Sequence, residues 1–331
     1  MRYLYIYFVS FIITEILSYL ITRLHWGESF KDSTFFRKEQ VLLIGGTIHF
    51  FSILISAMAA VYIFKFELDY IFIFILSAGF FIMLIGLFED LKKIDKFKRY
   101  FLEFLVFIII ILLDIKIKFL VLPGGKLIFL KPFYSFIVTL IWFFFITNFL
   151  SWFYELEGFI SGAVSISLIG ILLLMKLQGN INQPVILMNV IVLGTLLSIF
   201  RNEFFPAKIL TGRSGSIFLG FLLGILSLLG YTKLSTMFLV FFPIVLIFIF
   251  IFIFIVIIII SYIKGTLVTG LDSLVFHGSL KINYVLAFIF FLYFLTVSTY
   301  LILWYYKISI QFILLSMLLE VLVFTLIAFF I

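Results

Sequence analysis

The chain has no cysteine and few charged residues. Without cysteine it can form neither a disulfide framework nor a thiolate metal site. Charged residues make up 12% of the 331 residues and hydrophobic residues 65%, so there are too few polar groups to cover a globule in water. The first hydrophobic stretch, Tyr3 to Ile21, ends without a small-residue cleavage pattern and is interpreted as a retained anchor. These absences exclude a water-soluble or disulfide-stabilised protein.

Long apolar runs dominate what is present. Several reach the roughly 20 residues that a helix needs to cross a bilayer. They are apolar on every face, which favours helices, because a spanning helix satisfies its own backbone polar groups. We therefore predict an all-α polytopic membrane protein that forms a single domain over residues 1–331. About eleven transmembrane helices are expected, near residues 3–22, 41–63, 68–88, 101–115, 133–153, 159–176, 185–201, 215–231, 236–261, 284–306 and 308–331.

The lysines and arginines indicate the orientation. If the N-terminus lies on the outer side of the membrane, the inner face carries the loops near 23–40, 89–100, 154–158, 202–214 and 262–283. These loops and their flanks hold the majority of the 23 lysines and arginines, which predicts that they are cytoplasmic and that the protein lies in the cytoplasmic (inner) membrane.

Two further patterns concern the outer face and the partners. Two β-prone runs flank Pro123-Gly124-Gly125 and predict a small β-hairpin on the outer face. The net charge of +7 is scattered over loops, which is typical of contacts with anionic lipid headgroups. Nothing resembles a nucleic-acid-binding module, so the predicted partner is the lipid bilayer.

The most informative motif spans residues 206–220, which read P-A-K-I-L-T-G-R-S-G-S-I-F-L-G. A glycine-rich loop that runs into a helix N-terminus offers N–H groups and a helix dipole to a phosphate. This loop resembles that of the polyprenyl-phosphate N-acetylhexosamine-1-phosphate transferases, which are members of glycosyltransferase family 4. In that family an aspartate that helps to hold Mg²⁺ stands at the position of Arg213.

Three earlier loops resemble family motifs in the family's order. The pair Gly45-Gly46 is similar to the glycine pair that enters the second span. The block from Gly86 to Lys92 resembles the family's G-x-x-D-D-x-K motif, with Glu89 in place of the first aspartate and Asp90 matching the second.

The third of these loops and the last one are more divergent. In the third loop Asn148 matches an asparagine, while Tyr154 and Glu157 stand for two aspartates. The last loop keeps one histidine of a histidine-rich pattern, His277. If the resemblance is correct, Gly45, Asp90, Glu157, Arg213 and His277 should converge on one cytoplasmic-side cleft.

The resemblance implies that the chain transfers a sugar-1-phosphate from a UDP-N-acetylhexosamine to polyprenyl phosphate in cell-envelope glycan synthesis. It implies Mg²⁺ as cofactor and is compatible with a homodimer. Glu89, Asp90 and Glu157 take catalytic roles, and Asp90 is the candidate metal ligand. The residues assigned to substrate binding are Gly45, Gly46, Lys92, Asn148, Gly212, Arg213, Ser214, Gly215, Ser216 and His277.

The substitutions leave alternatives open. A fixed guanidinium competes with a dication for the same carboxylates, and the phenol of Tyr154 is uncharged at neutral pH. We expect the Arg213 head group within about 4 Å of Glu89, Asp90 or Glu157, although a direct contact with substrate phosphates is the other reading. The function is then either an impaired transfer or that of a catalytically silent relative that binds a lipid phosphate or a partner protein. A transporter is less well supported, because no inverted repeat is visible.

Overall fold

The computed structural model describes the chain up to Gly230 with several gaps. The described residues are 2–25, 36–37, 41–42, 44–66, 70–91, 94–121, 127–154, 158–177, 179, 182–203 and 209–230. The spans predicted near 236–261, 284–306 and 308–331 lie outside these residues. So do Lys92, Glu157 and His277.

Helices dominate the described residues. They are α1 (Arg2–His25), α2 (Gly45–Tyr62), α3 (Tyr70–Asp90), α4 (Lys96–Leu112), α5 (Pro132–Ser151), α6 (Phe159–Leu177), α7 (Gln183–Glu203) and α8 (Gly212–Gly230). Two short antiparallel strand pairs accompany them. One is β1 (Phe36–Arg37) with β2 (Val41–Leu42), and the other is β3 (Phe119–Val121) with β4 (Leu127–Phe129).

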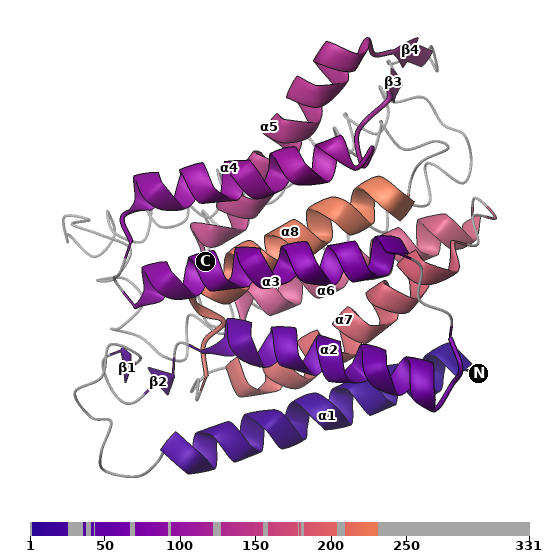
Figure 1. The fold of residues 1–331 in the computed structure, drawn as a ribbon. Helices are drawn as coiled ribbons and strands as arrows, with labels where there is room; N and C mark the ends of the chain where they lie inside the picture. Colours follow the sequence, from indigo (N-terminus) through magenta and orange to yellow (C-terminus); the bar gives the residue numbers. More distant parts are fainter. Residues whose placement is uncertain are drawn as a thin grey trace, which may run out of the picture. The chain divides into compact units, whose positions relative to one another are not determined.

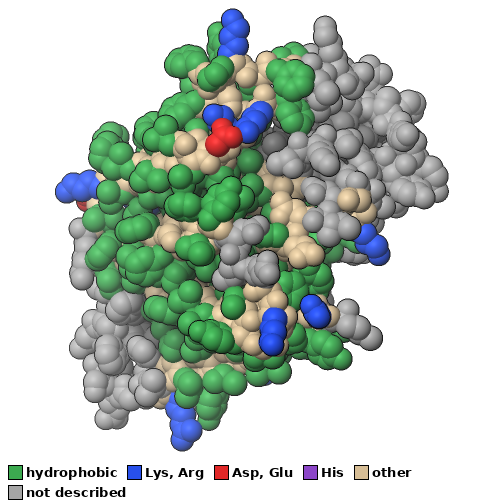
Figure 2. All heavy atoms as spheres, turned by 45° about the vertical axis from the view of Figure 1, so that its right-hand side comes forward, with side chains coloured by type: hydrophobic (Ala, Val, Ile, Leu, Met, Phe, Trp, Pro, Cys, Tyr) green, Lys and Arg blue, Asp and Glu red, His purple; other side chains and the backbone are tan. Residues whose placement is uncertain are grey.

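Seven of the described helices, all except α4, are long and apolar enough to cross a membrane. Figure 2 shows hydrophobic side chains over most of the described part of one face, with few charged side chains among them. An apolar surface of this kind suits contact with lipid tails better than contact with water. The mostly helical fold class is therefore confirmed.

Helix α4 differs from the other helices because polar residues are concentrated in its first two turns. It has 17 residues and begins at Lys96, inside the predicted loop near 89–100. Arg99 and Glu103 are buried on one face of it, while Phe101 and Leu105 are exposed. This amphipathic pattern lets α4 present an apolar side outward and carry charge into the helix bundle.

The described chain falls into two compact units. The eight described helices and the β1–β2 pair belong to one unit, and the β3–β4 pair belongs to the other. In the β3–β4 pair, Phe119 lies opposite Phe129, and Val121 lies opposite Leu127. The two strands flank the Pro123-Gly124-Gly125 segment, and their side of the membrane stays a prediction.

Helix α8 is the centre of the helical unit. In the apolar stretch of α8 that could span a membrane, 94% of the residues are buried. The corresponding share for α1 is 22%. Helix α8 contacts α2, α3, α5, α6 and α7, and Figure 1 shows it in orange beside α3. Every residue of α8 except Arg213 is classed as buried. Arg213 is thus the polar exception on the most enclosed helix.

One end of the helical unit gathers the sequence motifs. In Figure 1 the start of α2, the end of α3 and the starts of α4 and α8 all lie toward the left of the view. Antiparallel up-and-down helices joined by short connections place alternate loops at the same end. The motif loops before α2, between α3 and α4, and before α8 therefore come together although they are far apart in sequence.

Candidate functional site

The starts of α2 and α8 are joined backbone to backbone. The N–H of Gly45 donates to the carbonyl of Leu210 at 3.0 Å, and the N–H of Gly46 donates to the carbonyl of Thr211 at 3.1 Å. A Cβ added to Gly46 would overlap the backbone of Gly215. Glycine is needed at position 46 because the backbones at the starts of α2 and α8 approach too closely to leave room for a side chain.

Asp90 caps the N-terminus of α8. Its Oδ1 accepts a hydrogen bond from the N–H of Arg213 at 3.1 Å, and its Oδ2 accepts one from the N–H of Ser214 at 2.8 Å. Gly212 adopts a φ of 68°, a backbone region that glycine enters without steric cost. The carboxylate therefore occupies the N–H groups and the positive end of the helix dipole that would otherwise be offered to a phosphate.

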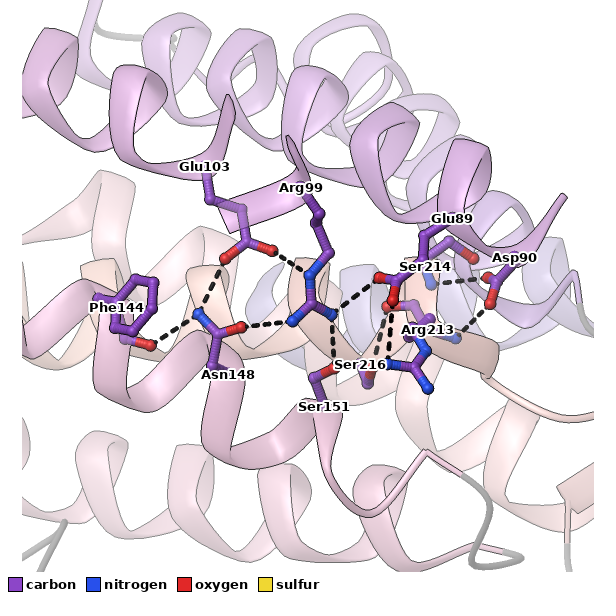
Figure 3. A network of polar contacts seen from close by, with 10 residues as sticks. All are labelled: Glu89, Asp90, Arg99, Glu103, Phe144, Asn148, Ser151, Arg213, Ser214 and Ser216. Atoms are coloured by element: carbon purple, nitrogen blue, oxygen red, sulfur yellow. Dashed lines mark hydrogen bonds and ion pairs between the residues drawn. The ribbon is translucent and has the colours of Figure 1, made fainter. Parts of the chain in front are cut away.

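Glu89 lies between two guanidinium groups (Figure 3). Its Oε1 is 3.1 Å from Nη1 of Arg213, and its Oε2 is 2.9 Å from Nη1 of Arg99. Its side chain is 7% exposed. A carboxylate in so little water needs compensation from opposite charge, and these two arginines provide it.

Arg99 ties α3, α4 and α5 together. Its side chain is 1% exposed, and its Nε lies 3.3 Å from Glu103 Oε1 on the same helix. Its Nη2 donates to Asn148 Oδ1 at 2.8 Å, and its Nη1 donates to Ser151 Oγ at 3.0 Å. Asn148 in turn donates to Glu103 Oε2 at 2.9 Å and to the carbonyl of Phe144 at 3.0 Å. The buried guanidinium is thereby surrounded by acceptors on three helices.

Arg213 is less enclosed than Arg99, Glu89 and Glu103. Its side chain is 19% exposed, and its Cζ lies 4.3 Å from the centre of the Tyr154 ring. A guanidinium over an aromatic face is attracted by the ring's negative quadrupole. The ion pair with Glu89 confirms the prediction that Arg213 lies within ion-pair distance of one of the motif carboxylates.

A further buried carboxylate, outside this network, is that of Glu203. Glu203, at the end of α7, accepts hydrogen bonds from the hydroxyls of Ser161 and Thr211, the former at 2.5 Å. It is 1% exposed. Glu203 links α6 and α7 to the segment that leads into α8, and so it supports the backbone that carries Arg213.

Sequence reasoning missed Glu103 and the structural part played by Glu203. A signal existed for Glu103, because Arg99 and Glu103 are spaced four apart in an otherwise apolar stretch, where charges are costly unless paired. Glu203 has no such partner in its own helix. Its hydroxyl donors lie on other elements and cannot be identified from spacing.

The structure brings together most of the residues predicted for the site. These are Gly45, Gly46, Glu89, Asp90, Asn148, Gly212, Arg213, Ser214, Gly215 and Ser216. Asn148 joins the group through Arg99, and Ser216 donates its hydroxyl to the carbonyl of Arg213 at 2.9 Å. The predicted convergence of Gly45, Asp90 and Arg213 is therefore present. Glu157 and His277, the other two members of that prediction, lie outside the described residues.

Mg²⁺ does not fit the described residues as they are arranged. Among them no group of three or more His, Cys, Asp or Glu side chains is placed to hold a metal ion. The oxygens of Asp90 accept hydrogen bonds from the N–H groups of Arg213 and Ser214, and those of Glu89 lie within ion-pair distance of Arg99 and Arg213. Because Mg²⁺ requires oxygen ligands at about 2.0–2.1 Å in near-octahedral geometry, it would have to displace these donors.

Comparison with known proteins agrees with the motifs. Residues 71–231 match the model of a family described as glycosyl transferase family 4. A stretch of 171 residues is also 31% identical to a protein of Bacillus subtilis (strain 168) described as a probable undecaprenyl-phosphate N-acetylglucosaminyl 1-phosphate transferase. The family resemblance is confirmed.

The family 4 segment covers α4 to α8 and nearly all of α3, and hence the whole network from Glu89 to Arg213. The match to the Bacillus subtilis protein covers 51% of this chain and 47% of that protein, so the chain spans about half the length of the curated relative. Together with the seven apolar helices, it identifies a multi-pass membrane protein.

Proposed function

We propose that this chain serves the polyprenyl-phosphate sugar-1-phosphate transfer of its family and that its own Mg²⁺-dependent turnover is impaired. Its ligands are a UDP-N-acetylhexosamine and polyprenyl phosphate, and its setting is cell-envelope glycan synthesis. The family 4 segment and the description of the Bacillus subtilis relative support the general role. The roles of Glu89, Asp90 and Glu157 in catalysis, and of the glycine and serine loop in substrate binding, belong to the same proposal.

One observation carries the impairment. Both oxygens of Asp90 accept hydrogen bonds from backbone N–H groups of this chain, and both oxygens of Glu89 lie within ion-pair distance of its arginines. Transfer of a phosphoryl group depends on positioned cations and on donors aimed at the phosphate oxygens. Here the carboxylates are directed at internal cations, and two N–H groups at the start of α8 are directed at Asp90. Binding of Mg²⁺ would require this arrangement to open.

The test is release of UMP by the purified protein. UDP-N-acetylglucosamine or UDP-N-acetylgalactosamine is supplied with undecaprenyl phosphate and Mg²⁺, and the Bacillus subtilis relative is assayed in parallel. We expect release far below that of the relative, and we expect no rise in Tm on addition of Mg²⁺. Turnover equal to that of the relative would overturn the impairment while leaving the family role intact.

The alternative is a catalytically silent family member that binds a lipid phosphate or a partner protein. The contacts of the Glu89 and Asp90 carboxylates with groups of this chain favour this alternative as well. Native mass spectrometry of the protein with undecaprenyl phosphate separates the two proposals. Bound lipid with no UMP in a single-turnover assay supports the silent member, and slow Mg²⁺-dependent UMP release supports the impaired transferase.

The proposal also includes the orientation of the chain in the membrane. The motif-bearing end of the helical unit is cytoplasmic, the β3–β4 hairpin is on the outer face, and the chain lies in the cytoplasmic membrane as a single domain of about eleven spans. A homodimer is compatible with it. The excess of lysine and arginine in the motif loops is the supporting observation.

A further inference from the structure

We propose that Arg213 is an internal cation that takes the electrostatic place of a divalent metal ion, so that the Glu89–Asp90 pair is complete without metal. Removing the Arg213 charge would uncover a latent site for a hard divalent cation such as Mn²⁺ or Mg²⁺. This role rests on the proposed function, because the implied requirement for Mg²⁺ comes from the family.

The charges of the network carry the first step. Two carboxylates, those of Glu89 and Glu103, lie within ion-pair distance of the guanidinium groups of Arg99 and Arg213 (Figure 3). A third carboxylate, that of Asp90, accepts hydrogen bonds from the backbone N–H groups of Arg213 and Ser214. If all five are ionised, the network retains one negative charge. Loss of Arg213 would leave three carboxylates and a single cation in a poorly hydrated site, which is the condition that favours binding of a divalent cation.

The two arginines are not equivalent. Arg99 is 1% exposed and contacts Glu89, Glu103, Asn148 and Ser151, so it is part of the packing between α3, α4 and α5. Arg213 is 19% exposed and contacts one carboxylate oxygen, Glu89 Oε1, at 3.1 Å. Its removal would free an oxygen at the accessible side of the network and leave the rest of the packing in place.

The position of Arg213 is held from two sides. Its own N–H is bound by Asp90, so the carboxylate pair holds both the backbone and the side chain of this residue. The Tyr154 ring lies against the guanidinium at 4.3 Å. A cation held by an ion pair and an aromatic face has little freedom to leave, unlike an exchangeable metal ion.

The experiment measures Mn²⁺ binding by electron paramagnetic resonance and the Tm with and without Mg²⁺. The wild-type protein is expected to bind no Mn²⁺ at this site and to keep the same Tm. Arg213→Gln, which removes the charge and keeps a long side chain beside Tyr154, is expected to lower the Tm, to bind Mn²⁺ and to recover Tm when Mg²⁺ is added. Adding Glu89→Gln to this variant should weaken Mn²⁺ binding by about tenfold or more, because a ligand oxygen is lost.

Two controls keep the result interpretable. Arg201→Gln removes an arginine that is 74% exposed and 3.7 Å from Glu15, and it should show neither Mn²⁺ binding nor a Tm response to Mg²⁺. Arg213→Lys retains the positive charge and should also bind no Mn²⁺. If Arg213→Gln does not fold without divalent cation, purification in Mg²⁺ should restore it.

Absence of Mn²⁺ binding and of Mg²⁺ rescue in Arg213→Gln would overturn the internal-cation role. It would not affect the proposed impairment, which is read from UMP release by the wild type. Conversely, UMP release by the wild type at the rate of the Bacillus subtilis relative would overturn the impairment and leave the Mn²⁺ result on Arg213→Gln to stand alone. The two proposals therefore fail by different measurements.

Discussion

Glu89 forms ion pairs with two arginines, Arg99 and Arg213. It lies 3.1 Å from Arg213 and 2.9 Å from Arg99, with 7% of its side chain exposed. The partners differ in burial, since the Arg99 side chain is 1% exposed and that of Arg213 is 19% exposed. Loss of the carboxylate charge would therefore leave one fully buried guanidinium and one partly buried guanidinium undercompensated.

We expect Glu89→Gln to lower the Tm of the purified protein markedly. Removing one member of a buried ion pair typically costs about 3–5 kcal/mol, because the remaining charge is left uncompensated. Thermal unfolding in detergent measures the effect. The value applies to the Arg99 side of the interaction, since solvent screens the more exposed Arg213.

Glu15→Gln is the matched control for this prediction. Glu15 is 3.7 Å from Arg201, whose side chain is 74% exposed. A pair whose cation is largely exposed to solvent contributes about 0–1 kcal/mol, so its loss should leave the Tm almost unchanged. Equal Tm changes in the two variants would show that the position of Glu89 between two arginines does not contribute to stability.

At the scale of elements, α8 depends on close contact with its neighbours. A Cβ added to Gly220 would lie 2.8 Å from Cα of Thr147 on α5, a backbone atom that cannot move by itself. A Cβ added to Gly224, one turn further along, would lie 3.3 Å from the edge of the Phe143 ring. The two glycines face the same helix, but only the first is in contact with its backbone.

We predict that Gly220→Ala destabilises the protein and that Gly224→Ala is tolerated. Overpacking against backbone typically costs about 1–3 kcal/mol. At Gly224 a small ring movement can accommodate the methyl group, and alanine gains about 1 kcal/mol in helix propensity over glycine. The yield of monodisperse protein and the Tm of each variant measure the difference. A Gly220→Ala variant as stable as Gly224→Ala would contradict the close packing of α8 on α5.

At the scale of the whole molecule, α4 offers a test of orientation. Lys98 is exposed in its first turn, and Lys118 follows its end with 57% of the side chain exposed. The chain has no cysteine, so a single introduced cysteine is labelled without background. If the motif-bearing end is cytoplasmic, these two positions lie on opposite sides of the membrane.

We expect Lys118→Cys to react with a membrane-impermeant maleimide on intact cells, and Lys98→Cys to react only after permeabilisation. The reason is the excess of lysine and arginine in the loops at the Lys98 end. The reverse labelling pattern would invert the proposed orientation. Labelling of both positions from one side would show that α4 does not cross the bilayer.

The sequence predicted the presence of the site better than its internal arrangement. It indicated that Gly45, Asp90 and Arg213 converge and that Arg213 pairs with a motif carboxylate, and both features are present. It did not predict that Asp90 caps α8. A motif that resembles a metal site assigns residue types to positions, but it does not say which donors reach each carboxylate oxygen.

Membrane embedding and helical structure were determined by the sequence alone, because hydrophobicity and the need to satisfy backbone polar groups act within each apolar segment. Which charged side chains of different helices meet was decided by the tertiary structure. Asp90 and Arg213 are separated by 123 residues, and Arg99 and Asn148 by 49. A side chain gains from an ion pair or a hydrogen bond only within a few ångströms of its partner. The packing of α3 and α5 on α8, and of α4 on α3 and α5, therefore determined that the carboxylates of this chain meet its own arginines.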